Sequence, residues 1–155
     1  MKLFGIVLAL TCCGTSAAKA DWEYTKWGMT LQQVVSASKN LARESSDRRP
    51  DSAGNVTKLV APYKSGKFSF EARFEFDAAD RLSAVTLFLT DKWLCDELQV
   101  SVETAYGPVQ GGTSTSLYII ENWQDQKNKN SVTFTALYRS DCYIHYSVIK
   151  SPGAD

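Results

Sequence analysis

The stretch that decides the fold is Phe68–Phe76, "FSFEARFEF". Its apolar and polar residues alternate without a break, a period of two that is typical of a β-strand with one buried and one exposed face. The apolar face must lie against a core, and the polar face is either solvated or in contact with a partner. The apolar face holds Phe68, Phe70, Ala72, Phe74 and Phe76, and the polar face holds Ser69, Glu71, Arg73 and Glu75.

Further strands are predicted on both sides of this one. Residues 56–61 form a short strand candidate that Pro62 ends, and Leu82–Leu89 is apolar on both faces, which favours a central position. Residues 43–55 are polar and contain proline and glycine, so we expect a mobile loop there. Three more strand candidates lie near residues 117–123, 132–138 and 142–149.

A helix is predicted to begin in "KWGMTLQQVV", residues 26–35. Thr30 at the N-cap and Gln33 three residues later form a capping box, and Met29 can pack on Val34 as a hydrophobic staple. Apolar residues at helical spacing extend this helix over residues 31–42.

A second helix is predicted to follow Thr90 or Asp91, and Gly107-Pro108 supplies a stop signal. The helix starts and the third-strand starts recur about 60 residues apart, so the order α-β-β-β occurs twice. We therefore expect one α+β domain over residues 21–155, made of two pseudo-repeats at about 28–90 and 91–150. The duplicated unit predicts an antiparallel sheet with two helices packed on one face.

The first twenty residues have the pattern of a secretory signal peptide. A positive start, an apolar run and Ala18-Lys19-Ala20 precede Asp21, whereas Cys12 and Cys13 fit a lipidation site badly. No later stretch has the roughly 20 apolar residues that a membrane span needs. Without Lys2 and Lys19 the chain keeps 15 basic and 17 acidic side chains, and this near-neutral balance argues against nucleic acid as a partner.

Cys95 and Cys142 are the two cysteines left after signal cleavage, and an oxidising compartment favours a disulfide between them. If the second helix is tied to the last strand in this way, Cys142 faces the helices. Strand alternation then places Tyr143 and His145 on the opposite face. The candidate partner-binding residues on that face are Glu71, Arg73, Glu75, Tyr143 and His145.

The residues Trp27-Gly28-Met29-Thr30, with Val34 four positions after Thr30, resemble the helix start of the SmpA/OmlA family of outer-membrane assembly lipoproteins. The repeated helix-plus-sheet layout is similar to that of the β-lactamase inhibitor protein family. This resemblance implies the duplicated fold and a sheet face that binds a protein, and it implies no particular partner. The second half lacks the Gly-Met-Thr motif.

The sequence indicates no catalytic, metal-binding or cofactor-binding residues. Glu71 and Glu75 would lie roughly 13 Å apart along a strand, which is too far for a carboxylate pair. His145 is most simply a solvent-facing strand histidine, and Gly111-Gly112 is interpreted as a loop pair. Two interpretations stay open for the aromatic residues at element ends, which either close the core or contact a partner: Trp22, Tyr24, Trp27, Trp93 and Trp123.

We therefore predict a non-enzymatic protein-binding module whose open sheet face contacts another envelope or secreted protein. An inhibitor, an immunity-type protein and an envelope-assembly accessory all fit this class. The main alternative is a small-ligand-binding protein or an enzyme with a pocket between sheet and helices, and a structural secreted protein is a third. The expected location is the periplasm, with secretion as the alternative.

Overall fold

A computed structural model describes residues 21–138 and 140–149 of the chain. The predicted signal peptide lies outside these residues and stays a prediction. None of the helices described is long and apolar enough to cross a membrane. The strands are β1 (Asp21–Trp22), β2 (Thr25–Lys26), β3 (Arg43–Glu44), β4 (Val56–Ser65), β5 (Phe68–Phe76), β6 (Leu82–Leu89), β7 (Gly111–Ser114), β8 (Tyr118–Asp125), β9 (Asn130–Leu137) and β10 (Cys142–Val148), and the α-helices are α1 (Leu31–Ala37) and α2 (Cys95–Tyr106).

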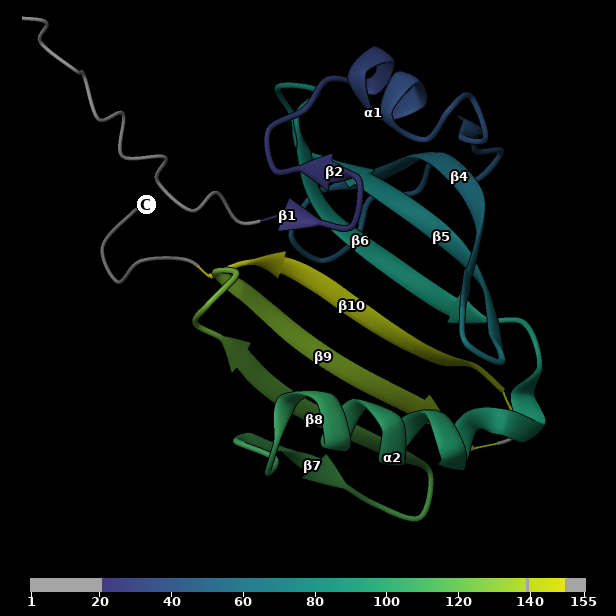
Figure 1. Cartoon of the computed structure of the whole chain (residues 1–155), viewed down its shortest axis with the longest axis vertical. Helices are drawn as coiled ribbons and strands as arrows, with labels where there is room; N and C mark the ends of the chain where they lie inside the picture. The colour runs from purple at the N-terminus through teal and green to yellow at the C-terminus, as the bar shows by residue number, and fades with distance from the viewer. Residues whose placement is uncertain (1–20, 139, 150–155) are drawn as a thin grey trace, which may run out of the picture.

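Within the described part of the chain, eight strands form one sheet in the order β3-β4-β5-β6-β10-β9-β8-β7, and every neighbouring pair is antiparallel (Figure 1). β1 and β2 form a separate small hairpin. Mostly antiparallel strands with two helices make this an α+β fold, as predicted. β6 and β10 pair at the centre, and on each side of them the strands run outward in the reverse of their chain order.

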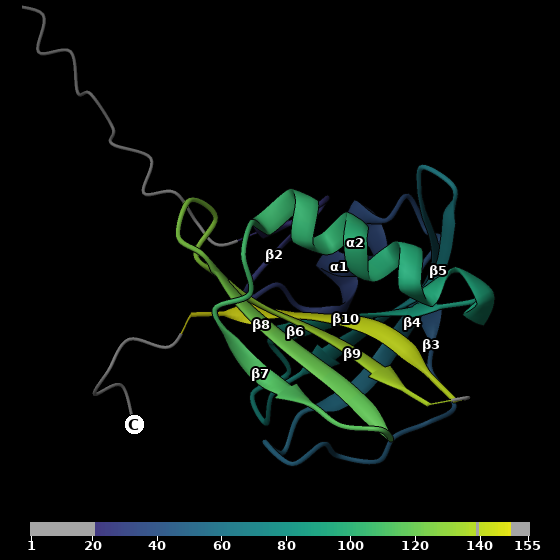
Figure 2. The same ribbon diagram turned by 90° about the horizontal axis from the view of Figure 1, so that it is seen from below.

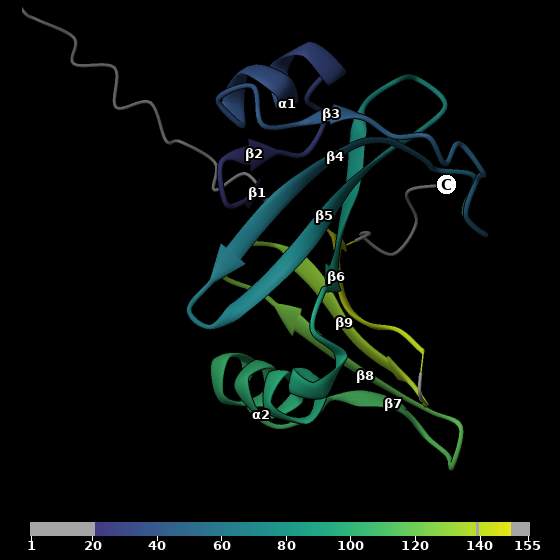
Figure 3. The same cartoon turned by 90° about the vertical axis from the view of Figure 1, so that its right-hand side faces the viewer.

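Both helices lie on the same side of the sheet (Figures 2 and 3). Val34 of α1 and Leu98 and Val102 of α2 are buried in one apolar cluster with the phenylalanines of β5. The cluster forms because alternation along each strand sends every second side chain to the helix side, and in β5 these are the apolar ones. The polar side chains between them point to the side without helices.

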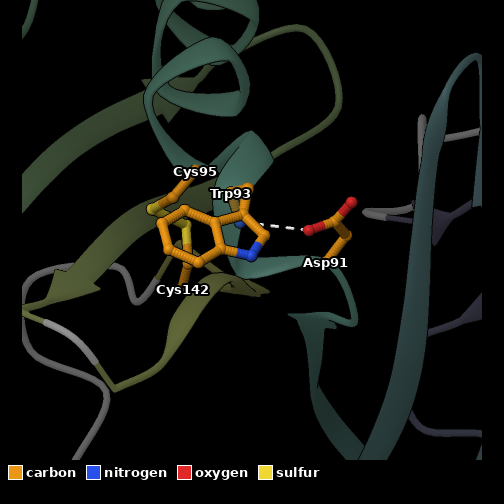
Figure 4. The surroundings of a disulfide bond; sticks show 4 residues. All are labelled: Asp91, Trp93, Cys95 and Cys142. Atoms are coloured by element: carbon orange, nitrogen blue, oxygen red, sulfur yellow. Dashed lines mark hydrogen bonds between the residues drawn. A yellow bond between two sulfur atoms is a disulfide. The ribbon is translucent and has the colours of Figure 1, made fainter.

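The predicted disulfide between Cys95 and Cys142 is present, with 5.9 Å between the two Cα atoms. It joins the first residue of α2 to the first residue of β10 (Figure 4). A link across 47 residues stabilises the fold by about 4 kcal/mol in the chain-entropy model. The bond therefore holds one helix at a fixed end of the sheet, and it is compatible with an extracytoplasmic compartment.

Helix α1 begins as predicted but ends five residues earlier. The capping box is formed, because Gln33 N–H donates to Thr30 Oγ1 and Thr30 N–H donates to Gln33 Oε1. The helix ends at Ala37 because Lys39 and Asn40 adopt positive φ, and the Ser38 hydroxyl then accepts the N–H of Ala42. The expected helix over residues 31–42 was therefore too long.

Three other boundaries differ from the sequence prediction. Residues 43–55 include the short strand β3, and Gly111-Gly112 is part of strand β7 rather than a loop. β4 continues through Pro62 to Ser65. It can do so because β3 pairs only with Leu59 and Val60, so that β4 is an edge strand at Pro62 and the missing N–H breaks no ladder there.

Trp22 fills the helix side of the sheet near the start of the described chain. Its indole packs edge-on against Tyr63 and Phe74, with ring centroids 5.1 and 5.9 Å away, and it is only 5% exposed. Trp22 and Trp123 are therefore core residues. Trp93, which the sequence did not distinguish from them, is 93% exposed.

We expect Trp22→Ala to lower the free energy of unfolding by about 3–5 kcal/mol, because it removes a large buried side chain and leaves a cavity. The measurement is denaturant unfolding of the oxidised protein. Trp93→Ala is the matched control, and its exposed indole should change stability by no more than about 0.5 kcal/mol. Similar losses in both variants would contradict the placement of Trp22 in the core.

Candidate functional site

The candidate site is the sheet surface on the side without helices, here called the open face. Register places its side chains in three rows across β5, β6, β10 and β9. One row is polar and central, one contains the aromatic residues, and one is made of small residues and a glutamate. The central polar row is Arg73, Thr86, His145 and Thr133. The row with the aromatic residues is Glu71, Phe88, Tyr143 and Thr135. The row of small residues and a glutamate is Glu75, Ala84, Ser147 and Ser131.

The structure places all five sequence-predicted residues on the open face. Glu71, Arg73 and Glu75 come from β5, and Tyr143 and His145 come from β10. β6 lies between these two strands and adds Thr86 and Phe88. Sequence reasoning missed both residues because Leu82–Leu89 is almost wholly apolar. The polar Thr86 within that apolar run was the sequence signal that could have indicated a site residue on β6.

One half of the site is a stack of charged and aromatic groups. Glu71 Oε1 accepts a hydrogen bond of 2.8 Å from Arg73 Nε, and the guanidinium carbon lies 4.0 Å from the ring centroid of Phe88. The rings of Phe88 and Tyr143 follow, 4.9 Å apart. A guanidinium held by a carboxylate and an aromatic face keeps a defined orientation. The stack therefore presents a fixed cation beside an aromatic surface.

The other half is a chain of hydrogen bonds from a buried carboxylate to an imidazole. Thr86 Oγ1 donates to Glu75 Oε1 at 2.5 Å and lies 2.9 Å from His145 Nδ1. Glu75 is 8% exposed and Thr86 is 4% exposed, whereas about a third of the His145 side chain is accessible. The two buried side chains, Glu75 and Thr86, thus position the partly accessible imidazole of His145.

Proton counting assigns the tautomer of His145. The Thr86 hydroxyl has a single proton, and a carboxylate only accepts hydrogen bonds, so this proton is directed to Glu75. Nδ1 of His145 must then donate to Thr86 Oγ1. In the neutral ring, Nε2 is then the nitrogen without a proton and can accept a hydrogen bond.

The segment Asp51–Asn55 borders the open face beside β6. Asn55 Oδ1 accepts from the Ser83 hydroxyl, and Asp51 Oδ1 accepts from the backbone N–H groups of Ala53 and Asn55. Burial acts to raise the pKa of Asp51, but the hydrogen bonds from Asn55 and Ala53 outweigh it and hold the pKa below its ordinary value. A carboxylate at the rim therefore stays ionised near neutral pH.

Together these groups surround a depression of about 810 Å³ on the open face. Its lining combines the rim segment Asp51–Asn55 with side chains from β5, β6, β9 and β10. The volume is in the range of ligand sites, but the depression is open to solvent rather than enclosed. The described residues contain no group of three or more His, Cys, Asp or Glu side chains placed to hold a metal ion.

Comparison with other proteins gives no match: no family model, no curated protein and no solved structure is recognisably similar to this chain. The resemblance of the helix start to the SmpA/OmlA family, and of the layout to the β-lactamase inhibitor protein family, stays a prediction from the sequence. The function must therefore be argued from the site itself.

We expect Thr86→Val to lower the free energy of unfolding by about 1–3 kcal/mol, because it leaves the buried Glu75 carboxylate without its donor. Thr133→Val is the matched control on the next strand but one, where the hydroxyl donates to the neutral Asn122 Oδ1 at 2.8 Å. Its loss should be about 1 kcal/mol. Denaturant unfolding measures both, and an equal or larger loss at Thr133 would contradict the role of Thr86.

Proposed function

We propose that the protein is a non-enzymatic binding module that recognises another envelope or secreted protein with its open face. The observation that carries this proposal is the stack of Glu71, Arg73, Phe88 and Tyr143, which is partly exposed on a sheet surface that no helix covers. An inhibitor, an immunity-type protein and an envelope-assembly accessory all fit this class. The proposal extends to the class and not to one of its members.

The composition of the open face suits protein recognition. Arginine and tyrosine are enriched among the residues that dominate the energy of protein interfaces, especially near the centre of the contact. Here Arg73 and Tyr143 are held against Phe88 on paired strands. Because the strands fix these side chains before binding, less conformational entropy is lost when a partner docks.

The charges of the open face indicate what the partner offers. The Asp51 carboxylate lies on the rim, Glu71 pairs with Arg73 on the open face, and the neutral His145 ring can accept a hydrogen bond at Nε2. A partner surface with donors opposite these acceptors, and with an apolar or aromatic group opposite Tyr143, would complement them. Electrostatic complementarity of this kind sets orientation and association rate more than affinity.

We also propose a periplasmic location and an origin of the fold by duplication. The disulfide and the predicted signal peptide support the periplasm, with secretion as the alternative. The mirrored strand order about β6 and β10 supports a duplicated helix-plus-sheet unit, in which β3 and β7 are the short outer strands of the two copies.

We expect the double variant Arg73→Ala/Tyr143→Ala to lose the partner that the unchanged protein captures from crosslinked envelope extract. Truncation of two central interface residues should weaken binding about thirtyfold or more, since one such residue contributes about 2 kcal/mol. The measurement is quantitative mass spectrometry of the captured proteins. Leu41→Ala is the control, because Leu41 is 58% exposed, follows α1 and does not line the depression on the open face. A partner retained by the double variant would refute the open face as its binding site.

A small-ligand role is the second candidate, and the depression of about 810 Å³ favours it. Another cavity lies where α2 begins beside the sheet, and the sequence suggested a pocket between sheet and helices. Its lining includes Cys95 and Asp96 of α2 with Ile119, Ala136 and Cys142 of the strands.

A ligand at a hundred times its dissociation constant should raise the free energy of unfolding by about 2.7 kcal/mol. Thermal unfolding in a metabolite screen measures this. A ligand of the depression would lose its effect in His145→Ala and keep it in Leu41→Ala. A screen without any stabilising compound would count against this candidate and leave protein binding in place.

A further inference from the structure

A second cavity, of about 870 Å³, lies at the end of the sheet where β6 leads into α2. We call it the end cavity. The β6–α2 connection borders it together with the connection between β7 and β8 and the turn after β9. It shares no lining residue with the depression on the open face. A function at this place is therefore independent of the open face.

The end cavity gathers unusually exposed apolar side chains. Trp93 is 93% exposed, Leu117 is 68% exposed and Tyr138 is 63% exposed, and all three line the cavity. They come from three different connections, so that only the tertiary fold brings them together. A large apolar patch with a polar border is typical of a surface that binds another molecule. Tryptophan in particular is enriched among the residues that dominate interface energy.

Trp93 is held in place by the residues on both sides of it. Asp91 Oδ1 accepts a hydrogen bond of 3.1 Å from the backbone N–H of Trp93, at the start of the 3₁₀ turn Lys92–Leu94 (Figure 4). Two residues later, Cys95 is tied to β10 by the disulfide. The backbone that carries the indole is thus fixed at both ends. Its exposure does not come from a freely moving segment.

Carboxylates surround the same apolar side chains. Asp91, Asp96 and Asp141 line the end cavity, and all three are exposed. Lys92 is the one basic residue among the described residues that line it. Asp91 and Asp96 lie at the start of a helix, where negative charge is favourable in any case. Asp141 comes from the turn before β10, on another side of the cavity, and has no such role.

We propose that the end cavity binds a segment of a partner protein that carries an arginine or lysine next to aliphatic residues. The cation stacks on the indole of Trp93 and pairs with the surrounding carboxylates, because an electron-rich ring and negative charge both attract a guanidinium. The aliphatic side chain contacts Leu117 and Tyr138. Neither an acidic segment nor a purely polar one satisfies both requirements.

The test uses a synthetic heptapeptide with Leu-Arg-Leu between glycine and serine residues, titrated into the ¹⁵N-labelled oxidised protein. We expect saturable shifts of the Trp93 indole N–H signal and of the Leu117 and Asp141 amide signals. The open-face residues Arg73 and His145 should not shift. Matched peptides with Leu-Glu-Leu and with Ser-Arg-Ser in the centre should bind at least about tenfold more weakly, which corresponds to the loss of one good contact.

Trp93→Ala and Asp141→Asn should each weaken binding of the Leu-Arg-Leu peptide, Trp93→Ala by about tenfold or more. Val100→Ala is the control for a lost exposed apolar side chain, since Val100 is 63% exposed on α2 and does not line the cavity. Unchanged binding in Trp93→Ala, equal binding of the Leu-Glu-Leu peptide, or no saturable shift at all would each overturn the proposal. Arg73→Ala/Tyr143→Ala should leave peptide binding intact, so that failure of the open face and failure of the end cavity are told apart.

Discussion

The pairing of β6 with β10 is the contact on which the rest of the structure depends. Five residue pairs, from Tyr143↔Phe88 to Ser147↔Ala84, join strands that are separated by more than fifty residues in the chain. Without this ladder β6 and β10 would be edge strands of two four-stranded sheets, each with unpaired backbone groups. With it the apolar cluster becomes continuous from Val34 of α1 to Val102 of α2. This one antiparallel pairing therefore makes both the sheet and the core continuous.

The same pairing builds the open face. Arg73 reaches Phe88 because β5 pairs with β6, and Phe88 reaches Tyr143 because β6 pairs with β10. A shift of β10 by one residue would turn His145 and Tyr143 into the core and expose Ile144. The disulfide at Cys142 opposes such a shift, since it fixes the first residue of β10 against α2. Core packing and site geometry are thus set by one register.

The two surfaces proposed for binding differ in how they are made. The open face consists of regular strands, and its side chains hold one another through the Glu71–Arg73 and Glu75–Thr86–His145 contacts. The end cavity is lined by connections together with the ends of β8, β9, β10 and α2, and a cap at Asp91 and the disulfide at Cys95 hold the backbone of Trp93 there. In the open face the side chains are held before any partner arrives, and in the end cavity the backbone is, which lowers the entropy lost on binding. A protein with two such surfaces can bind two partners at once or bind one partner at two places.

Local patterns in the sequence determined much of this protein. Alternation fixed the two faces of β5, the Thr30–Gln33 pair fixed the start of α1, and the isolated cysteine pair indicated the disulfide. The five predicted surface residues share a face because strand alternation is a local property. Only the tertiary structure decided which strands are neighbours, and so it alone brought Thr86 to His145 and placed Trp93 beside Leu117 and Tyr138. The physical reason is that the free energy of long-range pairing comes from the whole core, whereas alternation and caps depend on a few adjacent residues.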